Sequence, residues 1–179
     1  MAQMVEALSR HLFAEHGLPV FAVLDGASIL DLLDKFAELR PEYQCLRRGE
    51  LKPDLAEVAP YLVRLEEGTP FTRWVLEEGW GKHWGIFALA PADLRDMRRH
   101  FRTLTMVYDP DGKLLLFRFY DPRVLRVYLP TCNEQELTAV FGPVAGYLLE
   151  DEDPGTLLRF QFSAGSLVTE KKQVSPRED

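Results

Sequence analysis

The chain has 179 residues, a formal net charge of −7 at pH 7 and 46% hydrophobic residues. This length suits one domain with a sizeable core, and this composition is typical of soluble globular proteins. The negative charge argues against a general nucleic-acid binder, whose affinity comes from neutralising phosphates. No stretch approaches the apolar length that is needed to span a bilayer, so we expect no membrane contact.

The N-terminal segment lacks the basic region and long apolar core of a secretory signal. The two cysteines, Cys45 and Cys132, have no CxxC spacing and no histidine pair nearby. Isolated cysteines in a chain without an export signal are expected to be reduced thiols. We therefore predict a cytoplasmic protein without a metal site or cofactor.

Residues 2–100 alternate between helical and extended patterns. Helices are expected where apolar residues recur every three or four positions, at 2–15, 29–39, 70–78 and about 91–100. Strands are expected where short apolar runs occur, at 19–24, 43–46, 61–65 and 84–89. Thr69 and Pro70 are a typical helix start, because threonine caps the free amides and proline suits the first helical position. Residues 47–57 are polar and are interpreted as a surface loop.

The run LLLFRFY at 114–120 is the most apolar stretch of the second half. It predicts a strand buried on both faces, paired in a hairpin with residues 103–108 across the turn at 109–112. Asp121 and Pro122 are expected to stop that strand, because proline cannot donate to a β-ladder.

The last third begins with a helix from Asn133 to about Val140, with Glu136 in the capping-box position. A second hairpin is expected at 144–150 and 157–162. The sequence therefore predicts an α/β fold of the α+β type, with helices packed on a mixed, mostly antiparallel β-sheet. We expect one domain over residues 1–162 and a flexible polar tail over residues 163–179.

No residue pattern predicts catalysis by itself. Ser28, His83 and Asp121 could be written as a triad, but no GxSxG elbow supports it. Asp25 and Asp121 could form a hydrolase carboxylate pair, although carboxylates at strand ends are more often caps or ion-pair partners. The glycine- and tryptophan-rich segment 79–85 lacks the Lys-Ser/Thr ending of a P-loop and is interpreted as a tight turn whose indoles pack against the sheet.

Arginines are concentrated in two places. The helix expected at 91–100 has a basic face, which is interpreted as solvated or paired with local acids. Arg118 and Asp121 are expected in an internal ion-pair network, because a buried arginine must be paired. Arg123 and Arg126 follow the proline and are freer to face a partner.

Six stretches together resemble the type VI secretion effector-adaptor chaperones, a family described as domain of unknown function 4123. They are AVLDGA (22–27), APYLVRL (59–65), WVLEEGWGKHWGIF (74–87), LRDMRRHFR (94–102), VYDPDGKLLLFRFYDPRVLRVYLP (107–130) and VFGPV (140–144). The resemblance implies a bacterial cytoplasmic protein without enzymatic activity. It implies two protein partners, a toxic effector and the VgrG spike onto which the effector is loaded, and no nucleic acid or small-molecule substrate. Larger members have a C-terminal lobe, whereas only about thirty residues follow Gly146 here.

Two sets of residues follow from the resemblance and the pattern. The structural motif is expected to comprise Asp25, Gly26, Trp80, Trp84, Phe119 and Pro122. The partner-binding surface is expected to comprise Arg118, Tyr120, Asp121, Arg123, Arg126 and Tyr128, since arginine and tyrosine are enriched at interaction hot spots. The alternatives are a small carboxylate-dependent hydrolase that uses Asp25 or Asp121, and an immunity-like protein that blocks a basic toxin.

Overall fold

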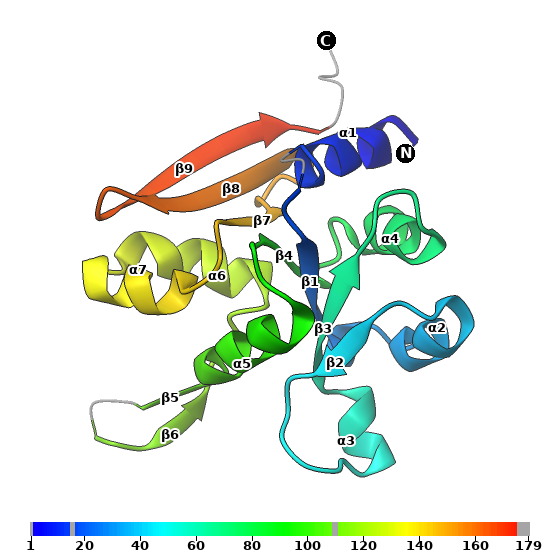
Figure 1. Ribbon diagram of the computed structural model, residues 1–179, viewed down its shortest axis with the longest axis horizontal. Coiled ribbons are helices and arrows are strands. Elements are labelled where there is room, and N and C mark those ends of the chain that lie inside the picture. The colour runs from blue at the N-terminus through cyan, green and yellow to red at the C-terminus, as the bar shows by residue number, and fades with distance from the viewer. Residues whose placement is uncertain (1, 15–16, 109–110, 175–179) are drawn as a thin grey trace.

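A computed structural model describes residues 2–14, 17–108 and 111–174 (Figure 1). Its main element is a seven-stranded sheet in the order β2-β3-β1-β4-β7-β8-β9. Its strands are β1 (Val20–Asp25), β2 (Tyr43–Cys45), β3 (Pro60–Leu65), β4 (Gly85–Leu89), β7 (Gly146–Glu150), β8 (Thr156–Ser163) and β9 (Ser166–Gln173). Each described pairing in this sheet is antiparallel, which confirms the expected α+β fold.

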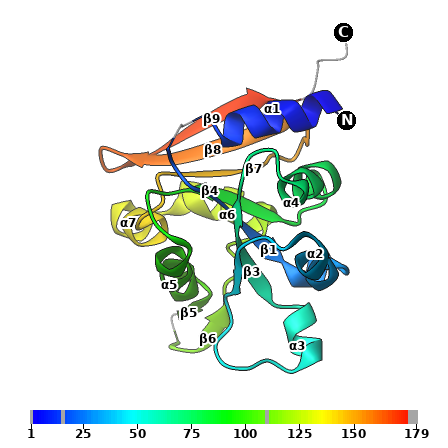
Figure 2. The same cartoon turned by 45° about the vertical axis from the view of Figure 1, so that its right-hand side comes forward.

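Helices cover both faces of the sheet (Figure 2). They are α1 (Ala2–Leu12), α2 (Leu32–Leu39), α3 (Pro53–Glu57), α4 (Pro70–Trp74), α5 (Leu94–Leu104), α6 (Pro122–Tyr128) and α7 (Glu134–Phe141). One core cluster contains buried residues of α5, α6 and α7, and a second contains buried residues of α1, α2 and α4. Along β1, Phe21 and Val23 enter the first cluster, whereas Val20, Ala22 and Leu24 enter the second. The continuous apolar run of this strand is thus explained by burial on both faces. Among the described residues, no helix combines the length and apolarity that crossing a bilayer requires.

Two predicted helix starts are confirmed, whereas the helix expected from residue 29 begins at Leu32. Thr69 accepts a hydrogen bond from the backbone amide of Thr72 at 3.4 Å, and Pro70 occupies the first turn of α4. The helix continues through a π-helical turn, η2 (Val75–Gly79). Asn133 and Glu136 form the expected capping box at the start of α7, with reciprocal hydrogen bonds of 2.8 and 2.9 Å.

The prediction of a buried strand over 114–120 is wrong. The hairpin itself exists, but β5 (Met106–Tyr108) and β6 (Leu114–Leu116) form a separate two-stranded sheet, and all three leucines of β6 are exposed. Of the expected turn, residues 109 and 110 lie outside the described residues. The chain leaves the strand pattern after Leu116, and Phe119 and Tyr120 enter the core from the segment that leads into α6.

Asp121 and Pro122 begin a helix directly after a turn at Phe119 and Tyr120, in which the Asp121 amide donates to the Arg118 carbonyl oxygen at 3.0 Å. Asp121 caps α6 by accepting a hydrogen bond from the Arg123 amide at 3.0 Å, and Pro122 stands at the first helical position. The same two residue types that stop a strand therefore start a helix here. Similarly, the expected loop 47–57 contains the short helix α3, which starts with Pro53.

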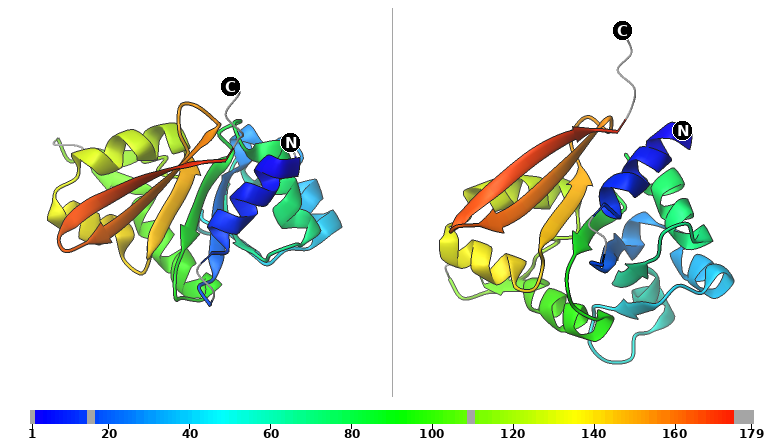
Figure 3. Two further views of the ribbon diagram at one scale, coloured as in Figure 1. Left: turned by 90° about the horizontal axis from the view of Figure 1, so that it is seen from above. Right: turned by 45° about the horizontal axis from the view of Figure 1, so that its top comes forward.

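The expectation of a loose tail from residue 163 is also wrong over most of its length. Residues Ser166–Gln173 form β9, which pairs with β8 from Thr156 to Ser163 and makes a long hairpin at one side of the sheet (Figure 3). The two strands turn at Ala164 and Gly165, both with positive φ. Many side chains of β9 are exposed, as at the edge of a sheet, which is why the segment has a polar composition. Residues 175–179 lie outside the described residues.

Candidate functional site

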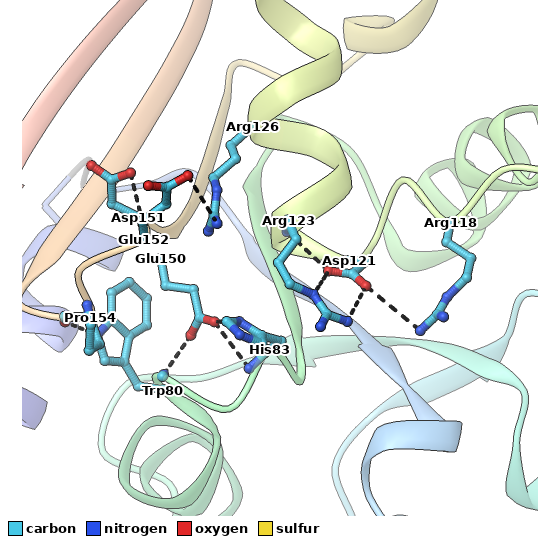
Figure 4. Close-up of polar contacts among 11 residues, drawn as sticks. Trp80, His83, Arg118, Asp121, Arg123, Arg126, Glu150, Asp151, Glu152 and Pro154 are labelled. Atoms are coloured by element: carbon cyan, nitrogen blue, oxygen red, sulfur yellow. Dashed lines mark hydrogen bonds and ion pairs between the residues drawn. The ribbon is translucent and has the colours of Figure 1, made fainter.

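One end of the central strands brings three distant segments together. There β1 ends at Asp25, β4 begins at Gly85 and β7 ends at Glu150. The Asp25 amide donates to the Trp84 carbonyl oxygen at 2.8 Å, which joins the first of these ends to the loop before β4. Charged side chains gather at this end and are called the polar cluster below: Asp25, His83, Arg118, Asp121, Arg123 and Glu150. All of them except Asp25 are labelled in Figure 4.

Arg118 connects the end of β1 to the start of α6. Its Nη2 atom lies 2.5 Å from Oδ2 of Asp25 and 3.8 Å from Oδ2 of Asp121. Asp25 is buried and also accepts hydrogen bonds from the Ala27 amide at 3.2 Å and the Ser28 hydroxyl at 2.9 Å. Burial opposes the charge on Arg118, but the neighbouring carboxylate of Asp25 outweighs it and raises the pKa of the guanidinium. The predicted pairing of Arg118 with Asp121 is therefore confirmed, at the start of a helix, but the expected burial of Arg118 is wrong, because its side chain is 43% exposed.

Asp121 is the most heavily paired carboxylate of the cluster. Besides capping α6, it accepts hydrogen bonds from Nε and Nη2 of Arg123 at 3.0 and 2.7 Å. Burial alone would raise the pKa of Asp121, but the hydrogen bonds and positive charge of Arg123 outweigh this effect, so the pKa lies below its ordinary value. The side chain is thus held as a carboxylate by arginines from two directions.

Glu150 was not singled out by the sequence patterns. It is buried at the end of β7 and accepts hydrogen bonds from the backbone amides of Gly81 at 2.5 Å and His83 at 3.0 Å, and it contacts Nδ1 of His83 (Figure 4). Its carboxylate therefore anchors the loop between η2 and β4. The signal that could have found it is an acid that directly follows the apolar run of a predicted strand.

The segment 79–85 is a tight turn, as predicted. Trp80 is buried, donates its indole N–H to the Pro154 carbonyl oxygen at 2.6 Å and stacks near Phe87. Trp84 packs against Trp74, with ring centroids 4.9 Å apart. Gly26 has no room for a side chain, because an added Cβ would lie 2.5 Å from the Ala59 carbonyl oxygen. These residues serve the fold, as the structural motif predicted.

The predicted partner-binding residues differ in their exposure. The side chains of Arg118 and Arg123 are 43% and 52% exposed, although both are paired with carboxylates. Tyr120 is buried, and Tyr128 is half-buried with its ring packed edge-on against Phe117 at 4.7 Å. Arg126 is only 15% exposed, so the expectation that it is free to face a partner is wrong. Tyr120 and Asp121 are only 3% and 4% exposed, so their side chains do not face a partner either. Partner binding by Arg118, Arg123 and Tyr128 stays a prediction.

A different surface brings several exposed apolar residues together. The hairpin β5–β6 projects from the body of the molecule below α5 (Figure 1). Its exposed side chains are Met106, Val107, Leu114, Leu115 and Leu116. Beside it lies a groove of about 770 Å³, called the hairpin groove below. It is lined by Leu46, Arg47, Arg48, Leu51, Pro60, Arg102, Thr103, Thr105, Met106, Leu114 and Leu116.

Replacing Arg118 by methionine is expected to lower the free energy of unfolding by about 1–2 kcal/mol. The change removes one donor from the buried Asp25 carboxylate, which keeps its bonds from Ala27 and Ser28. Partial exposure of Arg118 reduces the expected loss. Urea unfolding measures it, with Arg99→Met as the control, because Arg99 pairs only at the surface with Asp96. Equal stability of the two variants would show that the pair with Asp25 contributes nothing.

Comparison with known proteins finds one family whose model matches this chain. The family model described as domain of unknown function (DUF4123) matches residues 20–139, which run from β1 into α7. The matched span contains the hairpin β5–β6 and every member of the polar cluster except Glu150. No curated protein and no solved structure matches the chain. Among the described residues, no three His, Cys, Asp or Glu side chains gather to hold a metal ion.

Proposed function

We propose that this chain, which belongs to the domain of unknown function (DUF4123) family, is a non-enzymatic adaptor of type VI secretion in the bacterial cytoplasm. In this proposal it binds a toxic effector and helps to load it onto the VgrG spike. The observation that carries the proposal is the exposed apolar hairpin β5–β6 next to the hairpin groove. Contiguous apolar surface on a folded protein is typical of a site that binds another protein.

The polar cluster supports a scaffold rather than a reaction centre. The carboxylates of Asp25 and Asp121 are both bound by arginines, and the Glu150 carboxylate is bound by backbone amides. A general acid or nucleophile needs a carboxylate that a substrate can approach. Because these oxygens already accept hydrogen bonds within the fold, the hydrolase alternative has less support than the adaptor.

The proposal is tested by co-purification with the products of neighbouring genes. The tagged chain is expressed with the encoded spike and the encoded effector, singly and together, and we expect it to retain the effector. An unrelated effector of similar charge serves as the control. If neither partner is retained, or if the purified chain turns over a substrate, the adaptor assignment is wrong. If the chain instead abolishes the activity of the effector, it acts as an immunity protein.

Substitution of the three leucines of β6 is expected to reduce effector or spike retention by at least tenfold. The change Leu114→Asn, Leu115→Asn and Leu116→Asn removes exposed apolar surface without touching the core. Stability should change by only about 0.5 kcal/mol for each exposed site. The control is Val168→Asn on β9, which removes an exposed apolar side chain elsewhere. Full retention by the folded triple variant would move the binding site away from the hairpin.

A further inference from the structure

We infer that the hairpin groove receives an amphipathic helix of a partner protein, with an apolar face flanked by carboxylates. The inference rests on the proposed function, because it gives the chemistry of the segment through which the partner binds. It is carried by the two kinds of residue that line the groove, apolar side chains on the hairpin and arginines opposite them.

The apolar side of the groove follows from the pleat of the hairpin. Leu114, Leu116 and Met106 line the groove, whereas Leu115 and Val107 do not. The register agrees, because Met106 pairs with Leu116 and Val107 pairs with Leu115 across the hairpin. Alternate residues of a strand point to opposite faces, so only one face of the hairpin belongs to the groove. A volume of about 770 Å³ is in the range of pockets that enclose a drug-sized ligand, so the groove has space for apolar anchor side chains.

The charged side of the groove is positive in a chain whose net charge is −7. Arg47, Arg48 and Arg102 line it. Arg102 donates to the carbonyl oxygens of Leu46 at 3.0 Å and Arg47 at 2.5 Å, so its guanidinium is fixed in place. Within residues 2–14, 17–108 and 111–174, none of these three arginines forms an ion pair with a carboxylate. A partner with carboxylates would supply the negative charge that pairs with these arginines.

The positive charges also act on one another. Burial lowers the pKa of Arg102 most, and the positive charges of Arg98 and Arg48 lower it further. Arg98 is itself turned toward the backbone, since its Nε donates to the Cys45 carbonyl oxygen at 2.9 Å. Arg102 is thus held beside the positive charges of Arg48 and Arg98, and a carboxylate of a partner in the groove would relieve their repulsion.

Two observations favour a helix over a β-strand or a nucleic acid as the occupant of the hairpin groove. A strand would have to add to β5 or β6, and each of these offers only three residues for main-chain hydrogen bonds. A nucleic acid would meet the negative field of the whole chain and the exposed leucines, neither of which suits phosphate. An amphipathic helix presents apolar anchors every three or four residues and can carry glutamates along both flanks.

The test uses a synthetic fluorescent peptide helix of about 18 residues with leucines on one face and glutamates beside them. We expect it to bind the full chain at least tenfold more tightly than a peptide with lysines in place of the glutamates. Binding is measured by fluorescence anisotropy at two salt concentrations. A single-stranded oligonucleotide serves as the competitor, and its displacing the peptide at equal concentration would overturn the inference in favour of nucleic acid.

Two matched pairs of variants locate the peptide. Arg48→Glu is expected to weaken binding about tenfold, whereas Arg95→Glu, the same change on the exposed part of α5 outside the groove, leaves it unchanged. Leu116→Asn is expected to weaken binding, and Leu115→Asn, on the opposite face of the hairpin, is not. Because all four residues are exposed, the variants should fold.

The outcomes separate this inference from the proposed function. Equal effects within each pair, or equal affinity for both peptides, would overturn the groove as an acidic-helix site even if effector and spike are retained. Specific peptide binding without retention of either secretion partner would leave the groove established and would reject the adaptor function.

Discussion

Replacing Asp121 by alanine is expected to lower the free energy of unfolding by about 3 kcal/mol. The change removes the N-cap of α6, which is typically worth about 1 kcal/mol. It also removes the acceptor of Arg123 and the second carboxylate near Arg118. Breaking a buried ion pair costs about 3–5 kcal/mol, and the partial exposure of both arginines reduces that figure. Thermal and urea unfolding, monitored by circular dichroism, measure the loss.

The control for Asp121→Ala is Asp93→Ala. Asp93 caps α5 by accepting from the Asp96 amide at 2.8 Å, but it is exposed. We therefore expect a loss of about 1 kcal/mol there, from the cap alone. If Asp121→Ala costs no more than Asp93→Ala, the arginine pairs of the polar cluster do not stabilise the fold.

The pH dependence of folding stability is a second measurement on the Asp121→Ala variant. Because the pKa of Asp121 is lower in the folded chain than its ordinary value of 3.8, its pairing stabilises the fold fully above that value. This stability is lost as the pH falls below about 3.8 and through the lower folded pKa. The variant should therefore lose less stability than the wild type between pH 4 and pH 2. Burial would raise the pKa of Asp151, but the hydrogen bond and charge of Lys171 outweigh this effect and lower it. Because Asp151 is present in both proteins, its part of the pH dependence of stability is the same in both.

Replacing Glu150 by alanine is expected to cost about 3 kcal/mol and to loosen the loop between η2 and β4. The backbone amides of Gly81 and His83 lose their acceptor. An unsatisfied buried donor costs about 1–3 kcal/mol, and the exposure of Gly81 reduces its share of that figure. Glu150→Gln should cost less, because one side-chain oxygen remains as an acceptor. Urea unfolding gives the energies, and hydrogen exchange at Gly81 and His83 gives the local effect.

The neighbouring acid Glu152 is the control for Glu150. It is 84% exposed and lies 3.8 Å from Arg126, so Glu152→Ala should change stability by only about 0.5 kcal/mol. Slow exchange at Gly81 in Glu150→Ala, as in the unmodified chain, would mean that Trp80 and its bond to Pro154 hold the loop without the carboxylate.

The parts of the fold that follow from local patterns were predictable. Continuous apolar runs became β1 and β3, and Asn133 with Glu136 formed the expected helix start. The run LLLFRFY was interpreted as core because apolar runs usually are. Only Phe119 and Tyr120 are buried, whereas the leucines are exposed on β6. Composition alone does not distinguish an apolar run that lies on the surface from one that lies in the core.

The candidate site was predictable only in part. The pairing of Arg118 with Asp121 was predictable from their closeness in sequence, although the buried partner is the Asp121 carboxylate and Arg118 is partly exposed. The meeting of Asp25, His83 and Glu150 at one end of the sheet depends on the strand order β1-β4-β7, which no local pattern specifies. The hairpin groove likewise joins residues 46–60 to residues 102–116, which are distant in sequence.

The outermost strand β9 has a consequence for how copies of this protein meet. It carries Glu170, Lys171 and Lys172 in succession, and Lys172 pairs with Glu170 at 3.1 Å while Lys171 reaches Asp151 at 2.7 Å. Lysines on an edge strand discourage another chain from extending the sheet. This border of the sheet is therefore poorly suited to pairing with a second copy, whereas the leucine-rich hairpin lies at the opposite end of the molecule (Figure 1).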